Sequence, residues 1–201
     1  MKQAIILTAL IFMLFSCNTY KLTDADLEWQ PYKVGDMLVF ESSKGELDTI
    51  KVENIEVLTG ADDPLSVLPN KIQTLFVSGL YYHKPKKDIM GRMFSTTSCS
   101  VIGMRANSSG SFIEFTIRLG ENELKYPGVV QSIKEMSELN TDESGRYIIE
   151  AKEYYDNMKD RPFDLRYIYW SEKHGYLGLE FKNNYVWTLK SFIRGGEEMI
   201  R

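Results

Sequence analysis

The chain has 201 residues, of which 43% are hydrophobic, and its formal net charge is −4. This length suits one domain, and the hydrophobic share is enough to build a core. A mildly acidic chain lacks the basic surface that nucleic-acid binding requires, so we expect no nucleic-acid partner. The basic run Lys84-Pro85-Lys86-Lys87 is predicted to be a solvated loop, with contact to acidic lipid headgroups as the alternative.

The N-terminus has the pattern of an export signal. Lys2 precedes an uncharged, mostly apolar run from Ala4 to Phe15, which is shorter than the ~20 residues needed to span a bilayer. A buried core helix is the alternative interpretation of this run. The polar and acidic stretch that follows, from Asn18 to Glu28, has no pattern that would pair with such a helix.

The apolar run ends in Leu14-Phe15-Ser16-Cys17. This segment resembles the lipobox of bacterial lipoproteins, although Phe15 is bulky where that family usually has a small residue. The resemblance implies that residues 1–16 are a lipoprotein signal peptide and that Cys17 is acylated, for example with palmitate, after cleavage. Several acyl chains, as in that family, would hold the protein on its membrane, whereas one chain holds only marginally. An ordinary secretory signal with a coincidental cysteine is the alternative.

The resemblance also implies a location. No aspartate stands beside Cys17, a feature that marks inner-membrane retention in some bacteria, and no acidic cluster follows it directly. We therefore expect a lipid-anchored protein of the bacterial cell envelope, on the outer membrane and facing the periplasm. The expected partners are the membrane, through the N-terminal lipid, and an envelope protein or a lipid ligand.

Behind the signal, the sequence divides into three segments. Residues 17–33 are predicted to be a lipidated tether and entry segment, residues 34–194 an antiparallel β domain, and residues 195–201 a C-terminal tail. Within the first segment, Thr23 with Asp26 three residues later imitates a capping box, which predicts one helical turn.

The first strands of the domain start at Met37–Phe40. Ile50 and Val52 then alternate with charged residues, which is the pattern of a half-buried strand. The alternation slips by one residue to Ile55 and Val57. Such a slip predicts a β-bulge, because a bulge inserts one extra residue into a strand.

The middle of the chain is predicted to contain further strands and one short helix. After Pro127, the spacing of Val129, Ile133 and Met136 favours the helix. Residues 147–155 fit a helix or a strand, and we favour the strand. The other predicted strands cover 72–82, 99–106 and 112–119, the last two flanking a turn at 107–110.

The last third has the clearest pattern, a β-meander with strands at 165–170, 176–181 and 185–189. The pair Asn183-Asn184 predicts a tight turn, because asparagine tolerates positive φ. Alternation places three apolar residues on one buried face of the middle strand and makes Trp187 a buried residue of the next strand. The three residues are Leu177, Leu179 and Phe181.

Two tracts of this meander, Tyr169-Trp170-Ser171-Glu172-Lys173-His174-Gly175-Tyr176 and Val186-Trp187-Thr188-Leu189, carry a second resemblance. They resemble the closing meander (YWSxxxGY…VWxL) of an uncharacterised group of bacterial envelope lipoproteins. This resemblance covers about the last quarter of the chain and implies a fold and a location but no mechanism. The sequence as a whole predicts a mainly β protein with a single antiparallel β-sheet domain, either a curved sheet or a partial barrel or sandwich, with one short helix.

We expect no catalytic, cofactor or metal site, and lipidation of Cys17 is the only site that the sequence predicts. His83 and His174 are predicted to lie in or beside loops, and no paired histidine or cysteine spacing typical of metal sites occurs. Cys99 is predicted to be a small buried strand residue. Three aspartates recur at every fourth position without the pattern of a calcium loop: Asp156, Asp160 and Asp164.

Three functions remain open from the sequence. The first is a non-enzymatic envelope protein that binds a protein partner or supports an assembly, as a closed and filled core would favour. The second is a carrier of lipid or another small hydrophobic ligand, by analogy with periplasmic carriers that hold acyl chains in a curved sheet, and it needs an apolar cavity of several hundred Å³. The third is a glycan-acting enzyme, which needs two facing carboxylates in a cleft.

Overall fold

The computed structural model describes residues 18–63, 65, 69–87, 93–117, 119–120, 129–151 and 165–200. The predicted signal peptide and Cys17 lie outside these residues, as do Asp156, Asp160 and Asp164. No helix in the described part of the chain combines the length and the apolar character needed to cross a membrane.

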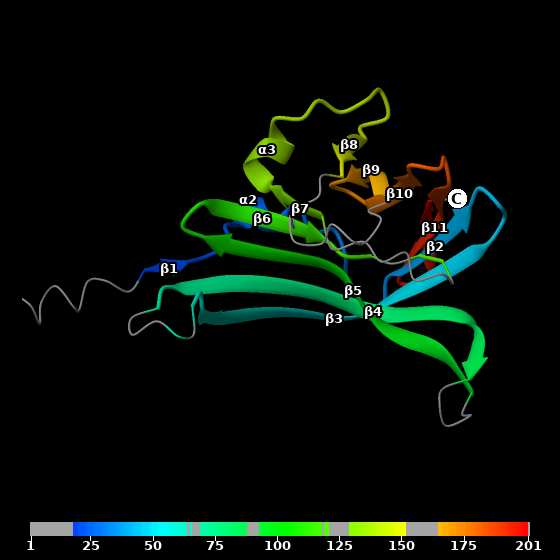
Figure 1. Cartoon of the computed structure of the whole chain (residues 1–201), viewed down its shortest axis with the longest axis horizontal. Helices are drawn as coiled ribbons and strands as arrows, with labels where there is room; N and C mark the ends of the chain where they lie inside the picture. Colours follow the sequence, from blue (N-terminus) through cyan, green and yellow to red (C-terminus); the bar gives the residue numbers. More distant parts are fainter. Residues whose placement is uncertain are drawn as a thin grey trace, which may run out of the picture.

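The described strands form one strongly curved sheet, a half-barrel, in which neighbouring strands run antiparallel except at one short pair (Figure 1). This confirms the predicted mainly β class and the single curved antiparallel sheet. The order across the sheet is β7-β6-β5-β4-β3-β2-β11-β10-β9-β8, while β12 pairs with β11 and the short β1 pairs in parallel with β4. The strands are β1 (Thr19–Tyr20), β2 (Met37–Ser42), β3 (Leu47–Ala61), β4 (Lys71–Lys87), β5 (Met93–Asn107), β6 (Gly110–Phe115), β7 (Val129–Ser132), β8 (Tyr147–Glu150), β9 (Leu165–Ser171), β10 (Gly175–Phe181), β11 (Val186–Arg194) and β12 (Glu197–Ile200).

Two short helices occur among the described residues, α2 (Asp24–Leu27) and α3 (Ile133–Ser137). The capping box predicted before α2 is present: the Asp26 amide donates to Thr23 Oγ1 at 3.1 Å, and the Thr23 amide donates to Asp26 Oδ2 at 2.8 Å. The helix predicted after Pro127 begins later than expected. Val129 lies in β7 instead, opposite Phe115 of β6, because β-branched residues pack well in a strand.

The predicted bulge in β3 is confirmed. The pairing of β3 with β4 shifts between Val52, which lies opposite Gly79, and Asn54, which lies opposite Ser78. The extra residue, Glu53, reverses the alternation of side chains along the strand. Val52 is therefore a core residue on one side of the bulge, and Ile55 is the next residue that packs against the core.

The predicted C-terminal meander is confirmed as β9, β10 and β11, with Asn184 at φ 61° in the tight turn and Trp187 fully buried. One detail of the prediction is wrong. The pairing of β10 with β9 shifts between Tyr176 and Gly178, so Tyr176 takes the fully buried position and Leu177 stays half-buried. Such a bulge leaves no mark in the alternation of three leucine and phenylalanine residues.

Large aromatic side chains fill the interior of the half-barrel. The Trp170 ring packs edge-on against Phe115 and Tyr176, with ring centroids 5.1 Å apart in each pair. The Tyr176 hydroxyl donates to the Val101 carbonyl at 3.1 Å, which joins β10 to β5 across the core. In the described part of the chain, the space that a ligand carrier would need is thus occupied by the protein's own side chains.

The entry segment is part of this core and not a free tether, which corrects the expectation for residues 17–33 over its described part. Leu22, Trp29 and Tyr32 are buried, and the Tyr176 amide donates to the Tyr32 hydroxyl at 2.8 Å. Burial raises the pKa of Tyr32 well above its usual value. These contacts fix the entry segment against the concave face of the sheet.

Two further expectations change. The basic run 84–87 was expected as a loop, but β4 continues through it, and Lys86 and Lys87 pair with Phe94 and Met93 of β5. The residues 197–200 of the expected C-terminal tail form β12, which pairs with β11. Strand pairing satisfies the backbone polar groups in both segments, and side-chain polarity alone does not predict such pairing.

Candidate functional site

The far half of β3, which we call the distal β3 edge (Glu53–Ala61), is paired on one side only. Its residues pair with β4 from Asn54 opposite Ser78 to Ala61 opposite Lys71. On the other side, the pairing with β2 ends at Lys51, opposite Met37. Among the described residues no strand covers the distal β3 edge. The amide and carbonyl of every second residue therefore point away from β4, in the plane of the sheet, without a partner strand.

A clamp marks the point where the covered half of β3 ends. The Val52 amide donates to the Asp36 carbonyl, and the Gly35 amide donates to the Val52 carbonyl, both at 2.8 Å. Asp36 is 1% exposed, and its carboxylate accepts from Arg194 Nε at 2.9 Å, from Arg194 Nη2 at 2.5 Å and from the Lys33 amide at 2.7 Å. On the edge of β3 that faces β2, backbone pairing stops at this clamp, whereas the pairing with β4 continues to Ala61.

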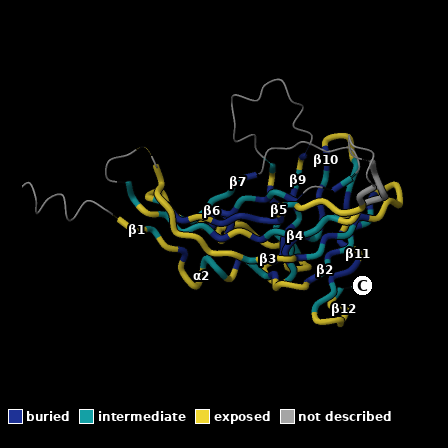
Figure 2. The backbone as a smooth tube through the Cα atoms, turned by 90° about the horizontal axis from the view of Figure 1, so that it is seen from below, coloured by how far each residue is buried: buried dark blue, intermediate teal, exposed yellow. Residues whose placement is uncertain are grey.

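Beyond the clamp, apolar side chains of β3 reach solvent on both faces of the sheet. Every residue from Glu53 to Ala61 is exposed except Ile55, which is half-buried (Figure 2). Val57 is 50% exposed and lies opposite Leu75, whereas Leu58, on the other face, is 46% exposed and lies opposite Thr74. An exposed edge that carries apolar residues on both faces is a template for another strand.

The outer face next to this edge carries a shallow hollow of about 30 Å³. Gly103 lines the hollow, and a Cβ at this position would make ordinary van der Waals contact with Glu114 Oε2, at 3.7 Å. The volume is that of about one water molecule, far below the several hundred Å³ of a ligand pocket. The lining residues are Thr74, Phe76, Gly103, Met104, Arg105, Phe112, Glu114 and Val130.

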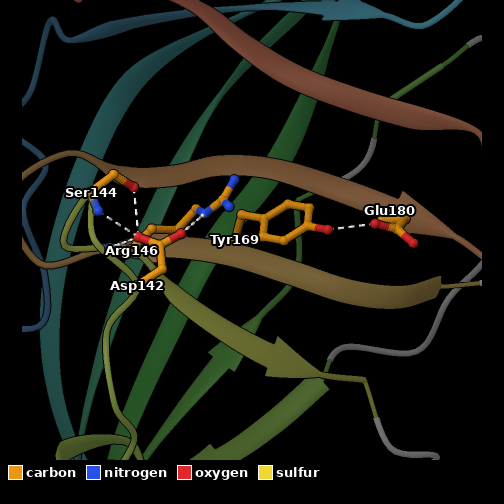
Figure 3. A network of polar contacts seen from close by, with 5 residues as sticks. All are labelled: Asp142, Ser144, Arg146, Tyr169 and Glu180. Carbon is orange, nitrogen blue, oxygen red and sulfur yellow. Dashed lines mark hydrogen bonds and ion pairs between the residues drawn. The ribbon is translucent and has the colours of Figure 1, made fainter.

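A polar network lies over β9 and β10, in a different part of the sheet from the distal β3 edge (Figure 3). The Asp142 carboxylate accepts from the Ser144 hydroxyl at 2.6 Å and from Arg146 Nε at 2.7 Å. The Arg146 guanidinium lies 4.6 Å from the centre of the Tyr169 ring, and the Tyr169 hydroxyl donates to Glu180. The network fastens the segment before β8 onto the sheet.

Each charged group in this network has a partner, Asp142 with Arg146 and Glu180 with Tyr169 and with Arg166 outside the network. Hydrogen bonds from Ser144 and Arg146 hold the pKa of Asp142 below its usual range, so this carboxylate stays ionised near neutral pH. Burial and the bond to Glu180 raise the pKa of Tyr169 to about 12. Arg146 and Tyr169 lie between the two carboxylates, and this arrangement differs from the facing acid and base of a glycosidase.

The residues singled out in the sequence are not brought together. Cys99 lies in β5, half-buried and not buried as predicted, with its thiol 3.5 Å from the Gly79 carbonyl. His174 lies in the turn before β10, with its ring edge-on to Phe192. His83 lies in β4, and its side chain is outside the described part. In that part, no three His, Cys, Asp or Glu side chains form a group that could hold a metal ion.

In comparisons with known proteins, the chain matches no protein-family model, no curated protein and no solved structure. The arrangement of the chain itself is therefore the basis for a function. The distal β3 edge was not predicted from the sequence. The signal that could have indicated it is local: Val57 and Leu58 are adjacent apolar residues in a strand, and neighbours in a strand face opposite ways.

Proposed function

We propose that this chain is a lipid-anchored lipoprotein of the bacterial envelope, without catalytic activity, that binds a protein partner by strand addition at the distal β3 edge. Acylation of Cys17 would supply the anchor, and the outer membrane facing the periplasm is the proposed location. The observation that carries the binding role is the half-paired β3, with exposed Val57 and Leu58 on its two faces. An added strand would gain backbone hydrogen bonds and cover these side chains.

The filled interior supports partner binding over ligand carriage. Trp170, Trp187 and Tyr176 are fully buried within the half-barrel, where a carrier would keep space for acyl chains. The mutual pairing of the polar groups in the Asp142–Glu180 network supports a structural role for them over an enzymatic one.

The anchor is tested with Cys17→Ser. We expect this variant to leave the membrane fraction and the wild-type protein to carry acyl chains, as measured by mass spectrometry of the mature N-terminus. Unchanged membrane retention of Cys17→Ser would refute the lipid anchor.

The binding edge is tested by photocrosslinking in cells, with a photoreactive amino acid at Leu58. Leu47 is the matched control, because it begins the same strand, is 57% exposed and lies on the covered half of β3. We expect a defined protein adduct from position 58 and not from position 47, and we expect Val57→Lys to abolish it, since a charge at an open edge opposes strand addition. Equal adducts at both positions, or an adduct that Val57→Lys leaves unchanged, would refute strand addition at this edge.

A further inference from the structure

The first described residues are fastened to the far end of the β3–β4 hairpin. Thr19 and Tyr20 pair in parallel with Lys71 and Ile72 of β4. The Asn18 amide donates to Asn70 Oδ1 at 3.3 Å, and the Lys71 amide donates to the Asn18 carbonyl at 2.8 Å. Parallel pairing places Asn18 beside Asn70, where the chain enters β4.

This fastening leaves no linker residues between Cys17 and the first paired residue of the fold. Cys17 directly precedes Asn18, and adjacent Cα atoms are about 3.8 Å apart. Acyl chains on Cys17 would therefore start within one residue of the point where β1 meets β4. A lipid anchor with no tether brings the nearest part of the domain to the membrane surface.

The nearest part is the end of the hairpin, which we call the β3–β4 tip (Ala61–Asp63, Leu65 and Pro69–Lys71). Leu65 lies in a turn and is 93% exposed, and its amide donates to Asp63 Oδ1 at 2.9 Å. The Asp62 amide donates to the Asn70 carbonyl at 2.8 Å, which closes the base of the tip. The tip thus presents one fully exposed leucine next to the residue that follows the acylation site.

The long strands β3 and β4 extend from this end toward the rest of the sheet (Figure 1). The fifteen residues of β3 run from the tip to the β2–β3 turn at Ser43–Glu46, at most ~50 Å at about 3.3 Å per residue. A bilayer in contact with the tip would consequently be far from Leu47, at the other end of the same strand. The distal β3 edge would lie between the membrane and the body of the domain.

We propose that the β3–β4 tip rests on the lipid bilayer, with Leu65 inserted at the level of the headgroups, so that the domain stands on its anchor. This inference rests on the proposed acylation of Cys17. The surface chemistry points to a zwitterionic membrane, because Asp62 and Asp63 outnumber Lys71 among the described tip residues and the net negative charge would be repelled by anionic headgroups. Apolar insertion beside the acyl chains would add a second contact to the same membrane.

The test uses the acylated full-length mature protein in vesicles of phosphatidylcholine, with and without bromine atoms on the acyl chains, which quench tryptophan fluorescence at short range. Leu65→Trp and the matched control Leu47→Trp each add one exposed tryptophan, at opposite ends of β3. The native Trp29, Trp170 and Trp187 are buried, and the unsubstituted protein supplies their background.

We expect brominated lipid to quench Leu65→Trp, with a blue-shifted emission, and to leave Leu47→Trp at the background level. Acylated Leu65→Trp without quenching would overturn the inference while leaving the lipid anchor intact. Equal quenching at both positions would overturn the upright orientation, because the domain would then lie flat. A mature N-terminus without acyl chains would overturn the anchor and this inference together.

Discussion

The two halves of β3 have similar apolar residues and opposite surroundings. In the near half, Ile50 and Val52 are fully buried, whereas in the far half Val57 and Leu58 are about half exposed. Both halves pair with β4, but only the near half also pairs with β2. The difference shows that a strand pattern predicts the strand and does not predict its burial, which depends on a second covering layer and a second neighbouring strand.

The covered half of β3 contributes to the stability of the fold, and the open half is available for binding. Ile50 and Val52 belong to the same hydrophobic cluster as Trp170 and Trp187. Removing such side chains costs transfer free energy and leaves a cavity, whereas an exposed side chain contributes little to stability. The following predictions would break or sharpen this comparison, and all use the Cys17→Ser background so that chemical denaturation is measured in water.

The largest effect is expected for Trp187→Ala, in the covered part of the sheet. Trp187 of β11 is fully buried and lies opposite Ser42 of β2. The substitution should lower the free energy of unfolding by about 3–5 kcal/mol. This is a large share of the roughly 5–15 kcal/mol typical of a domain. A wild-type denaturation midpoint would show that the covered region does not hold the stability assigned to it.

The second effect concerns the clamp that ends the covered half. Asp36→Asn removes the charge that binds Arg194 and leaves that guanidinium without its partner carboxylate. We expect a loss of about 3 kcal/mol, at the low end for breaking a buried ion pair, because the Arg194 side chain still reaches water. Arg194→Lys is the matched control, since it keeps the charge and loses the two-point contact. Equal free energies of unfolding for Asp36→Asn and wild type would mean that the clamp does not contribute to stability.

Local features of this fold could be predicted from the sequence, because their causes lie within a few residues. The bulge after Val52 appears as a slip in alternation, the cap before α2 as Thr23 and Asp26, and the turn at Asn184 as an asparagine pair. Each signal is a steric or hydrogen-bonding requirement of neighbouring residues.

Features that depend on distant partners could not be predicted. The pairing of β2 with β11 joins residues about 150 positions apart, for example Phe40 with Leu189. The burial of Tyr32 depends on Tyr176, and the exposure of Val57 depends on a missing neighbour strand in the described chain. The candidate binding edge belongs to this second class, because its exposure depends on which strands pair with β3.

The third prediction compares the two halves directly, with one substitution on each side of the bulge. Val52→Ala removes a fully buried side chain and should cost about 2 kcal/mol. Val57→Ala makes the same chemical change at a half-exposed position and should stay within about 0.5 kcal/mol of wild type. Urea denaturation of the two variants measures both. Equal losses would show that a layer covers the distal β3 edge, and strand addition there would lose its support.

The smallest effect is a pH dependence at the turn before β10. Burial first, and then the positive charges of Lys173 and Arg194, lower the pKa of His174 below its usual value of 6.5. As the pH falls through 6.5, the unfolded chain therefore takes up a proton before the folded chain does, and the free energy of unfolding decreases. Below the folded-state pKa both states carry the proton and the decrease stops.

His174→Gln should flatten this step, whereas His83→Gln serves as the control for a general histidine effect. Asp142 does not contribute between pH 7 and pH 5, because its pKa is lowered from 3.8 and it titrates only in stronger acid. A step of the same size in His174→Gln and wild type would show that the His174 ring is as well solvated in the folded protein as in the unfolded one, and that the covered region ends before this turn.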